Sequence, residues 1–313
     1  MRCLITGAAG FLGRHFTTHH VEAGDDVVAV DNFSSGRAQW APGRYEKSYL
    51  DAAQFFAHEG STYDLAYHFA APVGGREKIE GDPLYNADSL RLDAAFFRWA
   101  HGKVGTAIYP SSSAVYGIDL QEGAGTALRE VAFDPGQRMW LAPDEMYGFT
   151  KMAGEVLAAK AARYGLRTLV LRPFSGYGEG QPMDYPVPAI CHRALLRQNP
   201  LVVWGSGYQS RDFVHVSDIV GATQAALDKV PESGVLALNI GSGVPITFVE
   251  IAKMAARIVG YDPRIETDAS KPEGVHARYA DIRRLSRIYT PQVSLPEGLA
   301  RVIKSLSAEE IRQ

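Results

Sequence analysis

The sequence contains little of what three large classes of protein require. Its 313 residues include only 2 cysteines, Cys3 and Cys191, so the chain has no disulfide framework of the kind that small secreted proteins use. No stretch approaches the about 18 consecutive apolar residues of a membrane-spanning helix, and no charged leader with a long apolar core opens the chain. Lysine and arginine number 32 against 35 for aspartate and glutamate, so no overall basic field attracts nucleic acid. We therefore expect a cytoplasmic protein with no membrane and no nucleic-acid partner.

The first half of the chain alternates between two kinds of segment. Apolar runs typical of strands occur at residues 2–6, 27–30, 65–69, 106–109 and 168–172, and amphipathic stretches typical of helices separate them. This alternation predicts an α/β fold with a doubly wound parallel sheet of the Rossmann type. Such a sheet binds its ligands at the carboxyl ends of its strands.

Beyond Pro173 the pattern changes to loops rich in glycine and proline. Strands are expected at 201–204 and 237–240, and helices near 217–227 and 247–259. A chain of 313 residues suggests one large domain or two modest domains of about 150 residues each. We therefore predict a nucleotide-binding domain, residues 1–173, and a smaller C-terminal α/β substrate-binding lobe, residues 174–313, with an exchange of segments between them left open.

A glycine loop follows the first expected strand. The segment Gly7-Ala8-Ala9-Gly10-Phe11-Leu12-Gly13 opens a helix, and its glycines permit a tight turn and a close approach to a pyrophosphate. The second strand ends at Asp31-Asn32, where a carboxylate can bind both adenosine ribose hydroxyls and repel a 2'-phosphate. This pattern favours NAD over NADP, although Arg37 is near enough in sequence to weaken that preference.

Two further features suggest proton transfer. Tyr147 and Lys151 stand four positions apart in a segment expected to be helical, so the phenol and the ammonium share one face. The positive charge favours the phenolate form, which can exchange a proton with a substrate hydroxyl. A serine run at 111–113 ends a central strand, and a serine there can donate a hydrogen bond to a substrate oxygen that gains negative charge. Each feature alone is also typical of a solvated helix face or a polar turn, and their combination favours a catalytic site.

Seven motifs, in order along nearly the whole chain, resemble the extended short-chain dehydrogenase/reductase family, specifically its nucleotide-sugar epimerases and dehydratases. They are Gly7-Ala8-Ala9-Gly10-Phe11-Leu12-Gly13, Asp31-Asn32, His68-Phe69-Ala70-Ala71, Ser111-Ser112-Ser113-Ala114-Val115-Tyr116-Gly117, Tyr147-Gly148-Phe149-Thr150-Lys151, Leu171-Arg172-Pro173-Phe174 and Arg211-Asp212-Phe213-Val214-His215-Val216.

The resemblance implies roles for individual residues. Tyr147 would act as the acid/base, Lys151 would bind the nicotinamide ribose and polarise Tyr147, and Ser112 would contact the reacting sugar hydroxyl. The residues implied to bind the cofactor, NAD, are Gly7, Gly10, Phe11, Leu12, Asp31, Asn32, Ser35, Ala70, Ala71, Tyr147 and Lys151. Those implied to bind the substrate, a nucleotide-diphosphate sugar, are Ser112, Ser113, Ser175, Arg211 and Arg278. The family also implies a homodimer. We expect no metal, because His15 and His19, one turn apart, lack a third ligand.

Departures from the family pattern narrow the reaction. Ser113 and Ala114 stand where the C5,C6-dehydratases of the family carry an acidic pair, and Ala114 stands where its GDP-mannose 3,5-epimerases carry a cysteine. Both reactions therefore lose a proton carrier. A 4-epimerase needs only Tyr147 and the cofactor, because hydride leaves C4 for NAD, the ketone turns over in the pocket, and hydride returns to the other face. We predict epimerisation at C4 through a transient 4-keto intermediate.

Alternatives stay open at this stage. Within the family, the chain could be a 3,5-epimerase, a decarboxylase or another 4-keto-forming nucleotide-sugar enzyme. From another class, it could be a non-catalytic NAD-binding sensor, which the joint presence of Ser112, Tyr147 and Lys151 disfavours. The charged loop after Pro72 could also contact a substrate carboxylate or phosphate through Arg76 or Lys78, with exposure to solvent as the simpler interpretation.

Overall fold

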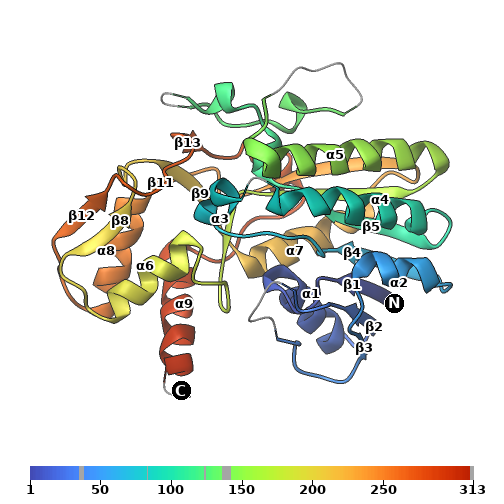
Figure 1. The fold of residues 1–313 in the computed structure, drawn as a ribbon, viewed down its shortest axis with the longest axis horizontal. Helices are drawn as coiled ribbons and strands as arrows, with labels where there is room; N and C mark the ends of the chain where they lie inside the picture. Colours follow the sequence, from blue (N-terminus) through green and yellow to red (C-terminus); the bar gives the residue numbers. More distant parts are fainter. Residues whose placement is uncertain (35–38, 83, 123–124, 136–141, 311–313) are drawn as a thin grey trace.

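A parallel sheet of seven strands forms the centre of the molecule (Figure 1). The computed structural model describes residues 1–34, 39–82, 84–122, 125–135 and 142–310. The order of the strands across the sheet is β10-β6-β5-β4-β1-β2-β3. Their bounds are β1 (Arg2–Thr6), β2 (Asp26–Val30), β3 (Glu46–Ser48), β4 (Tyr63–His68), β5 (Val104–Pro110), β6 (Arg167–Pro173) and β10 (Gly234–Ile240). The predicted fold class, a doubly wound parallel sheet, is confirmed.

The strand order reverses between β1 and β4. From β1 the chain first builds outward to β2 and β3, and then returns to add β4, β5 and β6 on the other side of β1. The loops that leave the carboxyl ends of β1 and β4 therefore diverge to opposite faces and leave a crevice between them. This crevice is the place where a ligand is expected in such a sheet.

Helices cover both faces of the sheet because its strands are apolar on both sides. On β1, Cys3 and Ile5 belong to one core cluster, and Leu4 belongs to the other. Figure 1 shows α1 (Phe11–Glu22) and α7 (Val216–Ala226) on one face, and α4 (Asp88–Ala100) and α5 (Glu145–Ala161) on the other. The short α2 (Ala52–His58) packs beside α4.

Smaller sheets and three helices form the second part of the molecule. One sheet contains β7 (Ser175–Tyr177), β9 (Ser210–His215), β11 (Pro245–Thr247) and β13 (Ala277–Arg278), and another pairs β8 (Leu201–Trp204) with β12 (Ile265–Asp268). The helices are α6 (Pro186–Leu195), α8 (Phe248–Val259) and α9 (Leu295–Glu310). They enclose a third apolar cluster, which includes Ile251 and Leu299. Among the described residues, no helix has the length and apolar character that crossing a membrane requires.

The chain crosses between these two parts more than once. Strand β10 pairs with β6 along its full length, from Gly234 opposite Arg167 to Ile240 opposite Pro173. The strand expected at 237–240 therefore joins the first sheet, and the helix expected near 217–227 contacts α1. The apolar run of β10 predicted a strand, but the run alone could not show which sheet edge the strand joins. A boundary at residue 173 consequently does not separate the large sheet from the rest of the chain.

Candidate active site

The turn between β1 and α1 requires glycine at two positions. Gly7 has a φ of +65°, and a Cβ there would lie 2.5 Å from the carbonyl carbon of Phe69. A Cβ on Gly13 would lie 2.0 Å from the carbonyl oxygen of Gly7. Gly10 is the N-cap of α1 and provides no side-chain cap, so the first backbone N–H groups of the helix stay available at the crevice. An anionic group such as a pyrophosphate fits this helix end.

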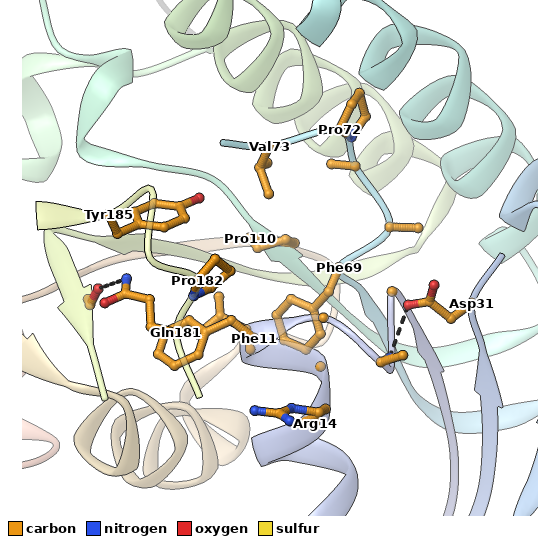
Figure 2. A pocket seen from close by; sticks show the side chains of 18 of the residues that line it. Phe11, Arg14, Asp31, Phe69, Pro72, Val73, Pro110, Gln181, Pro182 and Tyr185 are labelled. Atoms are coloured by element: carbon orange, nitrogen blue, oxygen red, sulfur yellow. Dashed lines mark hydrogen bonds between the residues drawn. The ribbon is translucent and has the colours of Figure 1, made fainter. Parts of the chain in front are cut away.

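Asp31 fixes the neighbouring loop at the end of β2. Its Oδ2 accepts a hydrogen bond from the Ala9 N–H at 3.0 Å, and its Oδ1 accepts one from the Phe33 N–H at 2.8 Å. Figure 2 shows Asp31 at one end of a cavity, bonded to the glycine loop, with Gln181 and Tyr185 at the other end. A carboxylate oxygen has more than one lone pair, so Asp31 can still accept a hydroxyl of a ribose.

The cavity between Asp31 and Tyr185 has a volume of about 1250 Å³. That exceeds the about 300–1,000 Å³ of ordinary small-molecule sites and suits an elongated ligand such as a dinucleotide. The described residues that were predicted to bind NAD all line it, and they are Gly7, Gly10, Phe11, Leu12, Asp31, Asn32, Ala70, Ala71, Tyr147 and Lys151. Ser35 and Arg37, which also entered the cofactor prediction, lie outside the described residues.

A buried ion pair fixes α5 to the end of β6. The Arg172 guanidinium donates to both carboxylate oxygens of Glu155 on α5, at 2.8 and 2.6 Å. The same guanidinium donates to the Tyr116 hydroxyl at 3.0 Å, and Ser111 Oγ donates to Glu155 at 2.5 Å. These bonds connect the middle of α5 to the serine run at the end of β5.

Tyr147 and Lys151 lie one turn apart near the N-terminal end of α5. The Lys151 Nζ atom is 5.9 Å from the ring centroid of Tyr147 and 5.5 Å from that of Tyr109. Lys151 is buried, with 4% of its surface exposed.

Ser112 follows β5 and caps a short 3-10 helix, where its Oγ accepts the Ala114 N–H at 3.1 Å. Because Oγ accepts this bond, the hydroxyl proton of Ser112 is available to a substrate oxygen.

A second cavity of about 330 Å³ adjoins the first. Its lining includes the residues predicted to bind substrate, Ser112, Ser113, Ser175, Arg211 and Arg278. Ser112 and Tyr147 line both cavities, so molecules bound in the two would meet at these side chains. The structure thus brings the predicted catalytic and binding residues to one place, and their individual roles remain predictions.

Sequence reasoning missed an acid of the second cavity, Asp144. Its carboxylate accepts a hydrogen bond from Arg76 Nη1 and another from Arg278 Nη2, each at 2.7 Å. Burial raises the pKa of Asp144, but the two guanidinium groups outweigh burial and hold the pKa below its ordinary value. Arg76 therefore faces the second cavity, where simple exposure to solvent had been the preferred interpretation. An aspartate directly before a helix usually indicates only an ordinary helix start, so nothing in the local pattern predicted this contact.

A group of side chains of the types that bind metals lies apart from both cavities in the described part of the chain. The ligand atoms of Cys3, His20 and Asp25 lie within 4.8 Å of one another. The two ring nitrogens of His20 already have partners, with Nδ1 2.7 Å from Asp25 Oδ2 and Nε2 2.8 Å from the Tyr67 hydroxyl. Hydrogen bonding accounts for this arrangement.

The fold and the site together define an extended short-chain dehydrogenase/reductase with a nucleotide-sugar type of active site. A dinucleotide crevice at the strand-order reversal is joined to a Ser112, Tyr147 and Lys151 set and to an arginine-lined second cavity. The chain belongs to the NAD dependent epimerase/dehydratase family, whose model matches residues 3–241. The description of the family agrees with the prediction of NAD as the cofactor.

Known proteins of this family resemble the whole chain. GDP-L-fucose synthase of Escherichia coli (strain K12) is 30% identical over 325 residues, which cover 96% of this chain and 94% of that protein. The solved structure of MoeE5 in complex with UDP-glucuronic acid and NAD is 30% identical, with a TM-score of 0.77 and coverage of 99% of this chain and 100% of that chain. A crystal structure of UDP-galactose 4-epimerase is 27% identical, with a TM-score of 0.81 and coverage of 99% of both chains. The relatives thus share the fold and differ in the reactions their names describe.

Proposed function

We propose that this protein is an NAD-dependent epimerase that inverts C4 of a nucleotide-diphosphate sugar. The observation that carries the proposal is that Ser112 and Tyr147 line both the dinucleotide-sized cavity and the arginine-lined cavity, with the buried Lys151 beside Tyr147. A sugar hydroxyl bound at that junction lies next to a proton acceptor and next to the site for the cofactor. NAD, when bound, supplies the hydride acceptor and donor for the sugar carbon.

Side chains of the protein would transfer the proton of the sugar hydroxyl and stabilise the negative charge that forms. Tyr147 would take the proton from the sugar hydroxyl and later return it, and the Lys151 ammonium would stabilise the phenolate between these events. Ser112, whose Oγ already accepts the Ala114 N–H, would donate its hydroxyl proton to the same sugar oxygen. Because the set serves both the forward and the return transfer, one acid/base suffices for inversion at C4.

The absence of a second acid/base at residue 114 supports C4 over other positions. Ala114 has no ionisable group, and Cys191 is fully buried among apolar residues of the C-terminal part, where burial raises its pKa to about 12. Asp144 is held by two arginines. Proton removal at C3 or C5 would need a differently placed group. A sensor without turnover would not need Ser112, Tyr147 and Lys151 at the junction of the two cavities.

A panel of nucleotide sugars tests the reaction. Purified protein would be incubated with UDP-, GDP-, CDP- and dTDP-sugars, with NMR used to identify inverted stereocentres and absorbance at the NADH band to follow net oxidation. We expect inversion at C4 with no net NADH. Inversion at C3 or C5, loss of carbon dioxide or net NADH would replace the proposal with a relative's reaction. If no sugar of the panel is converted while NAD stays bound, the result would favour a non-catalytic NAD-binding sensor.

Tyr147→Phe tests the role of the phenol. We expect turnover to fall by about 10²–10⁴-fold, the usual contribution of a general acid/base, while the NAD content of the protein stays unchanged. Tyr164→Phe is the matched control, because Tyr164 is 74% exposed and lines neither cavity. Equal turnover by Tyr147→Phe and wild-type protein would remove the proposed mechanism.

A further inference from the structure

Three arginines meet in the second cavity from three separate segments. Arg211 on β9 and Arg278 on β13 are directly paired residues of neighbouring strands, so their side chains leave the same face of the sheet. Arg76 comes from α3 (Arg76–Gly81), which follows the loop after β4. All three line the cavity together with Asp144. The segment after β4 thus contributes a charge to a subsite that β9 and β13 otherwise form.

Gly274 shows how closely Arg76 approaches Arg211. A Cβ built on Gly274 would lie 3.3 Å from Arg211 Nη2 and 3.5 Å from Arg76 Cζ. The two guanidinium groups therefore lie within van der Waals reach of the same point of the chain. Burial, followed by the nearby charge of Arg278, lowers the pKa of Arg211 to about 9. Like charges this close repel one another, so the arrangement favours an anion.

The charges of this cluster match a diphosphate. At neutral pH the three guanidinium groups carry three positive charges, and Asp144 supplies one negative charge, which leaves two positive charges. The diphosphate of a nucleotide sugar is esterified at both ends and carries two negative charges. Guanidinium groups suit phosphate oxygens because their N–H donors can form paired hydrogen bonds.

The other charged residues that line the cavity bond to other groups. These bonds are Glu273 to the Ser206 hydroxyl at 2.7 Å, Asp184 to the Gly75 N–H at 2.9 Å, and Arg193 to the Val202 carbonyl at 2.9 Å. Arg211 donates hydrogen bonds to the backbone carbonyls of Ser210 and Glu273. These two bonds can persist when an anion binds to Arg211. Asp144 is the carboxylate bonded directly to two of the three arginines.

We propose that Arg76 is a third arginine of the phosphate subsite, and that Asp144 occupies Arg76 and Arg278 until the diphosphate of the substrate replaces it. This inference rests on the proposed function for its ligand class, a nucleotide-diphosphate sugar, and adds a binding residue from outside β9 and β13. The exchange moves Asp144 off the two guanidinium groups but keeps its charge in the cluster, so the two negative charges of the diphosphate balance the two positive charges that remain.

Calorimetric titration of the NAD-loaded protein with inorganic pyrophosphate, UDP and GDP tests the proposal. We expect Arg76→Gln to weaken the binding of pyrophosphate, and of whichever nucleotide binds, by about tenfold or more, as for the loss of a charge-assisted hydrogen bond. Arg76→Lys should recover part of the lost affinity, because lysine keeps the positive charge but lacks the paired N–H donors of a guanidinium group. Asp144→Asn should bind pyrophosphate more tightly than wild type, because the competing carboxylate charge is removed.

Lys271→Gln is the matched control for Arg76→Gln. Lys271 pairs with Glu77 at 3.1 Å, so this substitution removes a positive charge from the same contact between two segments without changing the cavity lining. Its affinity for pyrophosphate should equal that of wild type. Circular dichroism and NAD content would verify that each variant is folded.

The results that would overturn the proposal are distinct from failure of the C4 reaction. Wild-type affinity in Arg76→Gln, equal losses in Arg76→Gln and Lys271→Gln, or no binding of any of the three probes would each reject it. A loss confined to UDP-glucuronate, with UDP-glucose unaffected, would show that Arg76 binds a sugar carboxylate instead. Weaker binding by Asp144→Asn would reject the exchange. Because pyrophosphate, UDP and GDP carry no hexose, the binding of these three probes does not depend on which carbon the enzyme inverts.

Discussion

Arg172 and Glu155 place two full charges in the interior of the protein. Their side chains are 0% and 1% exposed. Removing one partner would leave the other charge buried without compensation, so we expect Glu155→Gln to lower the free energy of unfolding by about 3–5 kcal/mol. Urea denaturation would measure this change. The loss should also loosen α5, because Glu155 is the residue of α5 to which Ser111 and Arg172 bond.

The surface pair between Glu297 and Arg301 provides the control. Its atoms are 2.6 Å apart, as close as those of the buried pair, but its side chains are 49% and 42% exposed. Water already solvates these charges, so Glu297→Gln should cost at most about 0.5 kcal/mol. Similar losses in the two variants would show that burial does not determine the contribution of the inner pair.

At the scale of residues, the sequence predicted the functional groups that lie close together in one segment. It did not predict those that depend on contacts with distant segments. Tyr147 and Lys151 were found because helical spacing alone places them on one face. Asp144 was not found, because its partners Arg76 and Arg278 are 68 and 134 positions away. Spacing in one segment contains no information about such partners, which only the tertiary fold brings together.

Helix α5 is held against β5 and α4 at a glycine. A Cβ on Gly154 would lie 1.9 Å from the Tyr109 hydroxyl and 2.8 Å from Asp93 Oδ2. Alanine in a helix is favoured over glycine by about 1 kcal/mol, but overpacking of a full core costs about 1–3 kcal/mol. We expect Gly154→Ala to lower the urea midpoint and, by displacing α5, to reduce turnover, measured on the substrate that the panel identifies.

Gly81→Ala is the corresponding control in a helix with open space. Nothing lies within 4 Å of a Cβ at Gly81, the last residue of α3. The free energy of unfolding of the Gly81→Ala variant should equal that of wild type or be slightly higher. If Gly154→Ala proves as stable as Gly81→Ala, close packing of α5 against Tyr109 does not fix the position of the catalytic helix.

At the scale of elements, strand prediction succeeded where the runs were apolar. Strands β1, β2, β4, β5 and β6 were all expected near their observed positions. Strand β3 was missed because its residues, Glu46–Ser48, are polar, and it gains its structure by pairing with β2 at the sheet edge. Pairing partners are a tertiary property, which also explains why β10 was expected in the second lobe.

At the scale of the whole molecule, β10 links the stability of the two parts. The chain leaves the first sheet after β6, builds β8 and β9, and returns to form β10. Unfolding of either part removes support from the other, so we expect one cooperative transition. Variants that keep only Trp99, in α4, or only Trp204, in β8, would report the two parts by fluorescence during urea denaturation.

The two tryptophan signals should give the same midpoint and the same dependence on urea, which is the test of two-state behaviour. Addition of NAD should shift both midpoints together, because a ligand that binds only the folded state stabilises whatever unfolds with it. A transition of Trp204 at lower urea, without change at Trp99, would show that the second part opens independently.

The late position of β10 in the chain also has a consequence for biosynthesis. Until residue 240 has left the ribosome, the outer edge of β6 has no partner, and the apolar positions that β10 later covers stay open to solvent. Unpaired strand edges and exposed apolar surface favour association with other chains during translation. We therefore expect a nascent chain of this protein to be open to aggregation between the emergence of β6 and that of β10, which is the interval in which a chaperone would protect it.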